Sequence, residues 1–195
     1  MSKEMEIRFK LDDYFQKIFF DWLNKNADFK GVVDQHDFCL YKSGEIEYYS
    51  QLDGFHKLLK YLRVRLTNKG DFVCFKEFQT DEQGKKTYFC DEFETSVANG
   101  KTMIHIFEKL GFLEKVELQK TRTTYKYKDF EIAIDDVLNY GICFEIELQK
   151  TGMNADKALH EIYNLLRSMG IKKITRMHRG YIKKYTHDPE EEIVL

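Results

Sequence analysis

One stretch late in the chain, residues 130–148, alternates apolar with polar residues along two runs joined by a turn. It reads FEIAIDDVLNYGICFEIEL, and this period of two is typical of strands that bury one face. The Asn-Tyr-Gly sequence at 139–141 favours a tight turn between antiparallel strands. The stretch therefore predicts a hairpin with Asp135, Glu145 and Glu147 on one face, either as a solvent-facing surface or as a functional site.

The N-terminal stretch, residues 3–11, repeats this alternation. Its apolar positions fall on one face of a predicted strand, and its charged positions fall on the other. The charged positions are Glu4, Glu6, Arg8 and Lys10. The two stretches together place acidic residues on strands at both ends of the chain.

Three segments have the apolar spacing of helices rather than strands. The first has Asp13 as its expected N-cap, and the second spans 101–110 and ends at Gly111. The third has Asn154 as its expected N-cap and ends at Gly170. Each helix carries a broad apolar stripe that needs an apolar surface to cover.

The middle of the chain predicts five further strands, at residues 32–41, 61–66, 72–79, 85–95 and 112–127, the last as one long strand or a bent pair. Their polar faces carry more bases than acids. The bases are Arg63, Arg65, Lys76, Lys120 and Arg122. The strands also carry Glu92 and Glu94 on one face, and His36 beside Asp37, either as a surface pair or as site residues.

About eight strands with short turns predict a closed antiparallel barrel. A barrel with a charged outer surface would leave the three helices nothing apolar to cover, although each large side chain buried contributes roughly 1.5 to 3 kcal/mol. We therefore expect the apolar strand faces to lie outward beneath the helices and the charged faces to line a hydrated tunnel. The predicted fold class is α+β, an eight-stranded antiparallel closed β-barrel with helices packed on the outside.

Length and composition favour one domain. The 195 residues are 43% hydrophobic, which predicts a single domain over 1–195, with a core at about 3–185 and a frayed tail at 186–195.

The 31 basic and 33 acidic residues nearly cancel, so we expect neither a nucleic-acid nor a membrane partner. No signal peptide and no apolar run near the ~20 residues of a transmembrane helix is present, which predicts a soluble, cytoplasmic protein. The single cysteines Cys39, Cys74, Cys90 and Cys143 are expected as buried, reduced thiols.

The charges sort along the sequence, with acids on the first strand and the last hairpin and bases mostly on the middle strands. Carboxylate oxygens suit hard divalent cations such as Mg²⁺, which share their carboxylates with substrate phosphates. Clustered arginine and lysine suit a polyanion with several phosphoryl groups. A metal-bridged polyphosphate would satisfy both sets of charges.

In these residues the chain resembles the CYTH family, which unites class IV adenylyl cyclases, thiamine triphosphatases and related inorganic triphosphatases in the triphosphate tunnel fold. The resemblance runs in order over nearly the whole chain. The residues that match the family's motifs are Glu4, Glu6 and Arg8, then Arg63, Arg65 and Lys76, then Lys120 and Arg122, then Asp135, Gly141, Glu145 and Glu147, and finally Arg179. One position departs from the family, which usually has a lysine where this chain has Arg8.

The resemblance implies a Mg²⁺- or Mn²⁺-dependent enzyme acting on a small triphosphate such as ATP, thiamine triphosphate or tripolyphosphate. The implied metal ligands are Glu4, Glu6, Asp135, Glu145 and Glu147, which with Arg8 form the implied catalytic set. The implied phosphate-binding residues are Arg8, Arg63, Arg65, Lys76, Lys120, Arg122 and Arg179. Monomer and homodimer both stay open.

Three functions remain open at this point. Hydrolysis by a metal-oriented water is favoured, because it needs no nucleoside pocket and no sequence feature indicates an adenine site. In a class IV adenylyl cyclase, the ribose 3′-hydroxyl of ATP would instead attack the α-phosphorus and release pyrophosphate. A third alternative is a non-catalytic module that binds a nucleotide or polyphosphate.

Overall fold

The computed structural model describes residues 5–42, 49–52, 55–58, 60–80, 87–149, 154–177 and 191–195. These residues form two compact units. Of the described residues, those from Val33 to Lys120 form the middle unit, and those up to Val32 and from Thr121 onward form the terminal unit. Whether they act as the predicted single domain stays a prediction.

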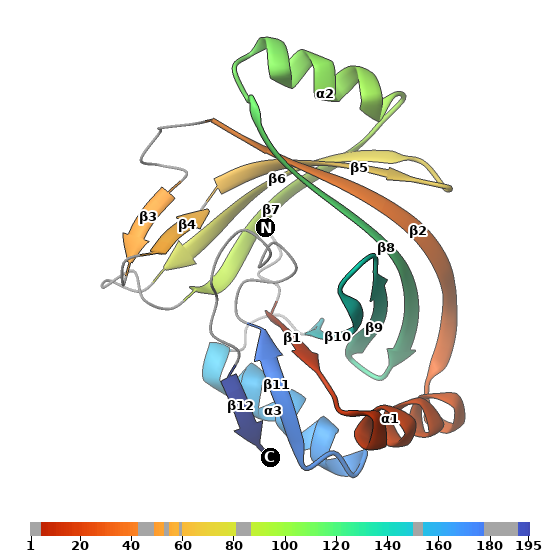
Figure 1. Cartoon of the computed structure of the whole chain (residues 1–195). Helices are drawn as coiled ribbons and strands as arrows, with labels where there is room; N and C mark the ends of the chain where they lie inside the picture. Colours follow the sequence, from red (N-terminus) through yellow and green to blue (C-terminus); the bar gives the residue numbers. More distant parts are fainter. Residues whose placement is uncertain are drawn as a thin grey trace. The chain divides into compact units, whose positions relative to one another are not determined.

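The terminal unit is an antiparallel sheet covered by two helices (Figure 1). Its strands follow the order β12-β11-β1-β10-β9, with the C-terminal part of β8 next. Their bounds are β1 Met5–Lys10, β8 Glu114–Tyr127, β9 Phe130–Val137, β10 Gly141–Leu148, β11 Lys173–Met177 and β12 Glu191–Val194. The helices are α1 Asp13–Asn26 and α3 Ala155–Ser168.

The core of the terminal unit lies between these helices and one face of the sheet. Ile7, Phe144 and Ile146 point from the strands into the same cluster as Phe19 of α1 and Ile162 of α3. The acidic and basic residues of β1 and β10 alternate with this apolar set and therefore lie on the opposite face.

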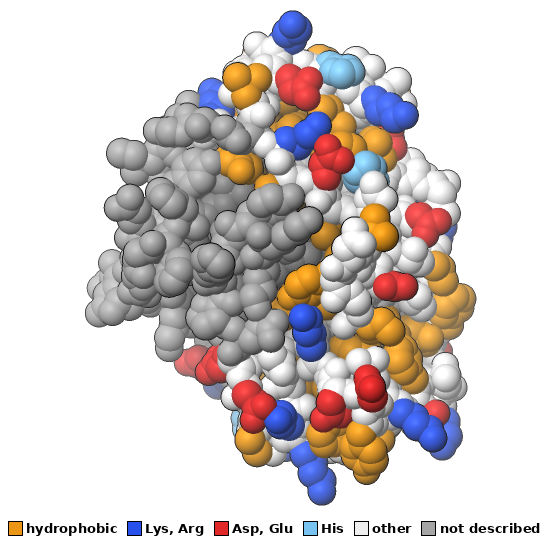
Figure 2. Space-filling view, in the orientation of Figure 1, with side chains coloured by type: hydrophobic (Ala, Val, Ile, Leu, Met, Phe, Trp, Pro, Cys, Tyr) orange, Lys and Arg blue, Asp and Glu red, His pale blue; other side chains and the backbone are white. Residues whose placement is uncertain are grey.

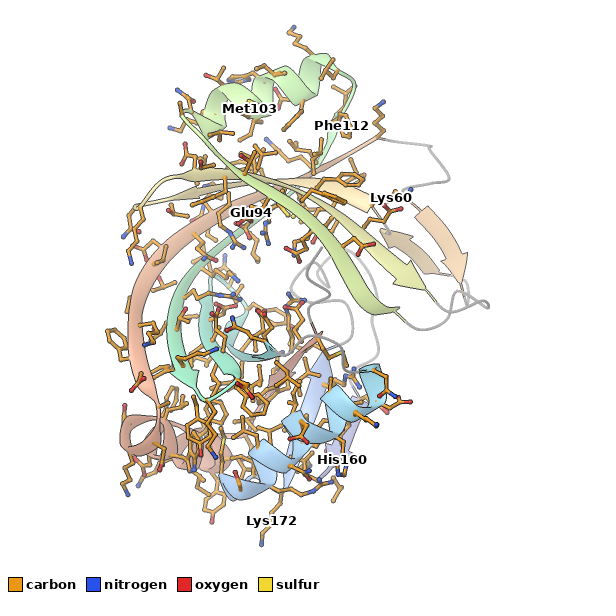
Figure 3. The ribbon with its side chains drawn as sticks, turned by 180° about the vertical axis from the view of Figure 1, so that it is seen from behind. Lys60, Glu94, Met103, Phe112, His160 and Lys172 are labelled. Atoms are coloured by element: carbon orange, nitrogen blue, oxygen red, sulfur yellow. The ribbon has the colours of Figure 1, made fainter. Side chains whose placement is uncertain are left out.

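The middle unit has the same layering. Its strands are β2 Asp28–Tyr41, β5 Lys60–Thr67, β6 Asp71–Thr80 and β7 Thr87–Val97, in that order across the sheet. Helix α2, Gly100–Lys109, packs on them through a core of Leu40, Val64 and Ile104. Figure 3 shows Met103 and Phe112 on the helix side of these strands and Glu94 on the other side. A separate small sheet pairs β3 Tyr49–Leu52 with β4 Phe55–Leu58.

The helix ends follow the sequence signals closely. Asn154 caps α3 by accepting a hydrogen bond from the backbone nitrogen of Lys157 at 2.9 Å. Gly111 and Gly170 follow α2 and α3 with φ of 92° and 89°, a left-handed conformation that glycine adopts at little cost. The cap of α1 is Asp12 rather than the predicted Asp13, because the Asp12 carboxylate is the one that accepts from the first turn.

The predicted closure of the sheet is wrong for the part of the chain that the structure describes. Its main sheet has ten strands rather than eight, and the strand order ends at β12 and β7 without closing into a barrel. One physical reason lies at β1, which pairs with β10 along one edge and with β11 along the other. The edge available for closure is therefore occupied by a strand that the sequence reading did not predict.

The predicted fraying of residues 186–195 stays a prediction, although the described end of this segment forms a strand. Strand β12 pairs antiparallel with β11, with Ile193 opposite Ile174. The backbone nitrogen of Leu195 also donates to the carbonyl oxygen of Lys172 at 2.8 Å. The rest of that tail lies outside the described residues.

On the face in Figure 2, lysine and arginine side chains are interspersed with aspartate and glutamate, as expected for a formal net charge of −2. Within the described ranges, no helix has both the length and the apolar character needed to cross a membrane. Cys39, Cys74 and Cys143 are buried, as predicted, and no disulfide links these three described thiols.

Candidate functional site

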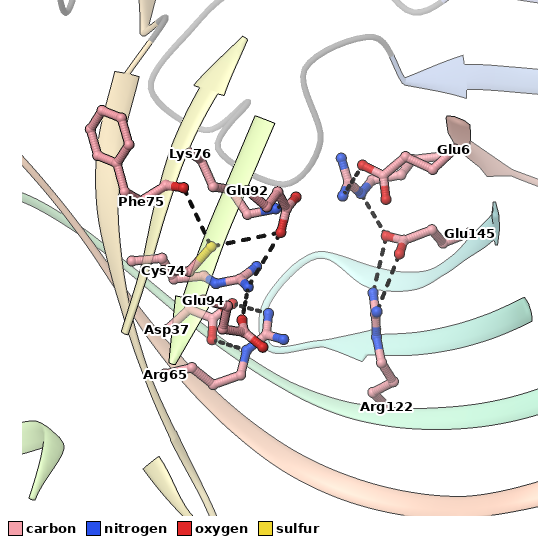
Figure 4. A network of polar contacts seen from close by, with 12 residues as sticks. Glu6, Asp37, Arg65, Cys74, Phe75, Lys76, Glu92, Glu94, Arg122 and Glu145 are labelled. Atoms are coloured by element: carbon pink, nitrogen blue, oxygen red, sulfur yellow. Dashed lines mark hydrogen bonds and ion pairs between the residues drawn. The ribbon is translucent and has the colours of Figure 1, made fainter. Parts of the chain in front are cut away.

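The charged face of the terminal unit holds a network of acids and arginines, called here the terminal cluster. It consists of Glu6, Arg8, Arg122, Asp135 and Glu145. Figure 4 shows Glu6, Arg122 and Glu145 of this network. The register of the strands brings these residues together, since Arg8 of β1 lies opposite Glu145 of β10. Glu145 and Asp135 are both buried, so their charges require partners nearby.

Two arginines supply those partners. Nε of Arg8 donates to Oε2 of Glu145 at 2.6 Å, while its Nη2 forms an ion pair with Glu6. Nε and Nη2 of Arg122 donate to the two carboxylate oxygens of Asp135, each at 2.7 Å. Nη1 and Nη2 of Arg122 also donate to Glu145 at 3.2 and 3.0 Å. Glu145 is therefore shared by two arginines.

The charged face of the middle unit holds a second network, called the middle cluster. It consists of Asp37, Arg63, Arg65, Lys76, Glu92 and Glu94 (Figure 4). Each base contacts an acid on a neighbouring or nearby strand. Asp37 forms two hydrogen bonds of 2.7 Å with Arg65, Glu94 accepts from Nη2 of Arg63 at 2.8 Å, and Glu92 pairs with Lys76.

Burial and charge act in opposite directions on Asp37. Burial alone would raise the pKa of its carboxyl group, but the hydrogen bonds and charge of Arg65, together with Arg63 and Lys120, lower that pKa to about 2. Asp37 is therefore ionised at neutral pH and gives these bases a permanent counter-charge.

Two buried thiols of the middle unit, those of Cys39 and Cys74, lie beside the middle cluster. Cys39 and Cys74 stand on either side of Arg63 in the strand register. Burial raises the pKa of Cys39 to about 12 and that of Cys74 to about 11, even though nearby bases favour the thiolates. Both thiols are neutral at physiological pH, which makes them poor nucleophiles.

The predicted site residues fall into five groups. The structure brings Glu6, Arg8, Arg122, Asp135 and Glu145 together in the terminal cluster, and Arg63, Arg65 and Lys76 together in the middle cluster. Glu147 shares the charged face of β10 and stands opposite Glu6. Lys120 is buried close enough to Asp37 to affect its pKa. Glu4 and Arg179 lie outside the described residues, and the expectation that all these residues line one cavity stays a prediction.

The sequence reading did not assign the acids of the middle cluster. Glu92 and Glu94 were visible as alternating glutamates on one strand face, but their partners follow from register, which sets Lys76 opposite Glu92. Asp37 was left open between a surface pair with His36 and a site. The structure excludes the pair, since Asp37 is buried against Arg65 and Nε2 of His36 lies 3.3 Å from Glu117.

The donor chemistry of the terminal cluster fits a hard divalent cation, because its acids are all carboxylates. Arginines now contact the oxygens of Glu6, Asp135 and Glu145. Among the residues described, no group of three or more His, Cys, Asp or Glu side chains is arranged as a metal site. A divalent ion bound here would share these oxygens with the arginines or take the place of an arginine at some of them.

Three kinds of comparison bear on this arrangement. The sequence profile of the CYTH domain matches residues 2–181. A Methanocaldococcus jannaschii protein named "Putative adenylate cyclase MJ0240" is 29% identical over 181 residues, or 92% of this chain and 97% of that protein. The PH1819 protein from Pyrococcus horikoshii OT3 has a similar fold, with a TM-score of 0.69 at 20% identity over 93% of this chain and 97% of that chain.

A plant protein has the same fold. It is "Putative adenylyl cyclase HpAC1" from Hippeastrum, described as revealing a dominant triphosphatase activity. Its TM-score is 0.60 at 16% identity, over 95% of this chain and 94% of that chain. At such identities these structures support the fold alone. The profile match spans both charged clusters and most of the sequence, and on that ground the chain belongs to the CYTH domain family.

Proposed function

We propose that this CYTH protein binds a small triphosphate together with Mg²⁺ or Mn²⁺ and hydrolyses its terminal phosphate. The observation that carries the proposal is the terminal cluster, in which buried carboxylates and arginines cross-link the charged face of one sheet. Such a face is costly to bury unless a ligand or a paired charge occupies it. A triphosphate with a divalent ion offers both charges that these residues can bind.

The basic residues would bind the phosphates. Guanidinium groups donate two parallel hydrogen bonds to phosphate oxygens, and lysine adds a point charge. The residues proposed for this role are Arg8, Arg63, Arg65, Lys76, Lys120, Arg122 and Arg179. Their positive charge would also stabilise the charge that develops as the phosphoryl group leaves.

The carboxylates would hold the divalent ion. The proposed ligands are Glu4, Glu6, Asp135, Glu145 and Glu147. When bound, such an ion neutralises phosphate charge and orients a water for attack. The protein's part is an exchange of partners, because Arg8 and Arg122 would turn from Glu145 toward phosphate oxygens.

A second candidate is adenylyl cyclisation of ATP to cyclic AMP and pyrophosphate. The observation in its favour is the name of the M. jannaschii relative, whereas the description of the Hippeastrum protein favours triphosphatase activity. A third candidate is a non-catalytic module that binds a nucleotide or polyphosphate. The same charged clusters would serve all three functions, so the products of the reaction must separate them.

The test is to incubate the purified protein with ATP, thiamine triphosphate and tripolyphosphate, first with Mg²⁺ and then with Mn²⁺. Release of orthophosphate and a diphosphate would support hydrolysis. Formation of cyclic AMP with pyrophosphate would replace this proposal by the cyclase. Binding without any product would support the module. The Glu147→Gln variant, purified in parallel, controls for contaminating phosphatases, because a contaminant would act equally in both preparations.

A further inference from the structure

Asp37 and Arg65 form the most enclosed ion pair of the middle cluster. The side chain of Asp37 is 6% exposed and that of Arg65 is 15% exposed, and the two residues stand opposite each other on β2 and β5. Nε of Arg65 donates to Oδ1 of Asp37 and Nη2 donates to Oδ2, each at 2.7 Å. Both oxygens of the carboxylate are therefore used to fix one side of the guanidinium group.

This side-on geometry determines which edge of Arg65 remains available. The Nε and Nη2 side faces Asp37, so Nη1 points away from it. No described residue accepts a hydrogen bond from Nη1. A free arginine side chain has several rotatable bonds, and holding it in one orientation reduces the entropy lost when it binds a ligand.

Arg122 of the terminal unit is held in the same way, and there the Nη1 edge contacts a carboxylate. Asp135 contacts Nε and Nη2 of Arg122 at the same two distances of 2.7 Å. Nη1 of Arg122 donates to a carboxylate oxygen of Glu145 at 3.2 Å. In Arg122, therefore, an aspartate holds the Nε and Nη2 side while the Nη1 edge binds an anionic oxygen.

We propose that Asp37 is a positioning residue that holds Arg65 with its Nη1 edge directed at an anionic oxygen of the bound triphosphate. The inference rests on the proposed function only as far as triphosphate binding, and it does not depend on hydrolysis. Asp37 touches no substrate in this account and acts only through Arg65.

The test is a double-mutant cycle on binding. The dissociation constant of the non-hydrolysable β,γ-imido analogue of ATP, with Mg²⁺, is measured by calorimetry for the wild type, Asp37→Ala, Arg65→Ala and the double variant. Asp37→Ala should weaken binding about 10-fold, the upper end of the cost of ordering one flexible side chain when a ligand binds. In the Arg65→Ala background the same change should weaken binding less than about 3-fold, because the residue through which Asp37 acts is gone.

Two further variants serve as a conservative substitution of Asp37 and as a control on the same strand. Asp37→Asn keeps the shape of the side chain but offers one acceptor oxygen in place of two, so it should weaken binding even if Asp37→Ala does not fold. Asp28 lies on the same strand at an exposed position, with its carboxylate 3.7 Å from Nζ of Lys30. The Asp28→Asn variant should therefore bind the analogue with the affinity of the wild type.

The outcomes separate the two proposals. Binding of the analogue by a wild-type protein that turns over no triphosphate would refute the proposed hydrolysis and leave the positioning role testable by the cycle. Equal losses from Asp37→Ala in both backgrounds would overturn the positioning role, because Asp37 would then act independently of Arg65. Absence of binding by the wild type would overturn both.

Discussion

Arg8 and Glu145 stand directly opposite each other on β1 and β10, and Nε of Arg8 donates to Oε2 of Glu145 at 2.6 Å. The second arm of the same guanidinium contacts Glu6. A lysine, the usual residue of the family at this position, has one ammonium group and lacks the fork that contacts two carboxylates at once. Arg8 therefore neutralises part of the metal-binding set that we propose, and it competes with the metal for the same oxygens.

Removing Arg8 should make the protein depend more on the metal. In Arg8→Ala, Glu6 and Glu145 lose a counter-charge and repel each other more strongly, so the apo protein should melt at a lower temperature. Mg²⁺ or Mn²⁺ should then raise the melting temperature by more than in the wild type, because binding to the native state stabilises it by mass action. Thermal melts across a metal titration measure this. Lys173→Ala, which breaks an exposed ion pair with Glu192, is the control, and an unchanged metal response in Arg8→Ala would contradict the competition.

Asp37 should give the protein a specific dependence on acid. Its folded-state pKa of about 2 lies below the ordinary value of 3.8, so its contribution to stability is fully present above about pH 4 and is lost as the pH falls toward 2. The difference in unfolding free energy between the wild type and Asp37→Asn should therefore shrink by about 2 kcal/mol over that range. Denaturant unfolding at a series of pH values measures it, with Asp28→Asn as the exposed control. A difference that stays constant between pH 5 and pH 2 would show that Asp37 carries no such charge interaction.

Alternation was enough to predict which strand faces carry charge. Ile7, Phe144 and Ile146 lie in the core beneath the helices, and Arg8 and Glu145 lie on the other face, as the period of two predicted. The helix ends at Gly111 and Gly170 were also predicted, because glycine is favoured where the backbone turns left-handed.

Strand partners were harder to predict, because a period of two assigns a face to each residue but names no neighbour. The pairing of β11 with β1 and β12 depends on contacts far apart in the sequence, and it leaves the described sheet open. The partners of the middle cluster were missed for the same reason. Glu92 meets Lys76 only through the register of β6 and β7.

The core directly behind the terminal cluster should be sensitive to cavities. Phe144 is fully buried, with its ring centroid 5.7 Å from that of Phe9 and 4.9 Å from that of Phe19. Phe144→Ala should lower the unfolding free energy by about 3 to 5 kcal/mol, the range for removing a buried phenylalanine. Denaturant titration followed by circular dichroism gives this value. Leu138→Ala, at an exposed position in the neighbouring turn, should change stability by less than about 0.5 kcal/mol, and a similarly small loss for Phe144→Ala would contradict the described packing.

The central claim is that the carboxylates of the terminal unit act on a triphosphate together with a divalent ion. Glu147 tests it cleanly, because it shares the charged face of β10 with Glu145 and stands opposite Glu6. Glu147→Gln keeps the shape of the side chain and removes one negative charge, so affinity for the ion should fall. Glu161→Gln, on the exposed surface of α3, makes the same chemical change away from the cluster.

The most direct measurement is the release of phosphate from tripolyphosphate and ATP during titration with Mg²⁺ and Mn²⁺, with excess EDTA as the metal-free condition. We predict turnover by the wild type and Glu161→Gln that depends on the ion and disappears with EDTA. Glu147→Gln should lose most of this activity and most of the metal-dependent rise in melting temperature. Equal turnover by the wild type in excess EDTA, or full activity of Glu147→Gln, would contradict the metal-dependent account and leave the carboxylates only as counter-charges for the arginines.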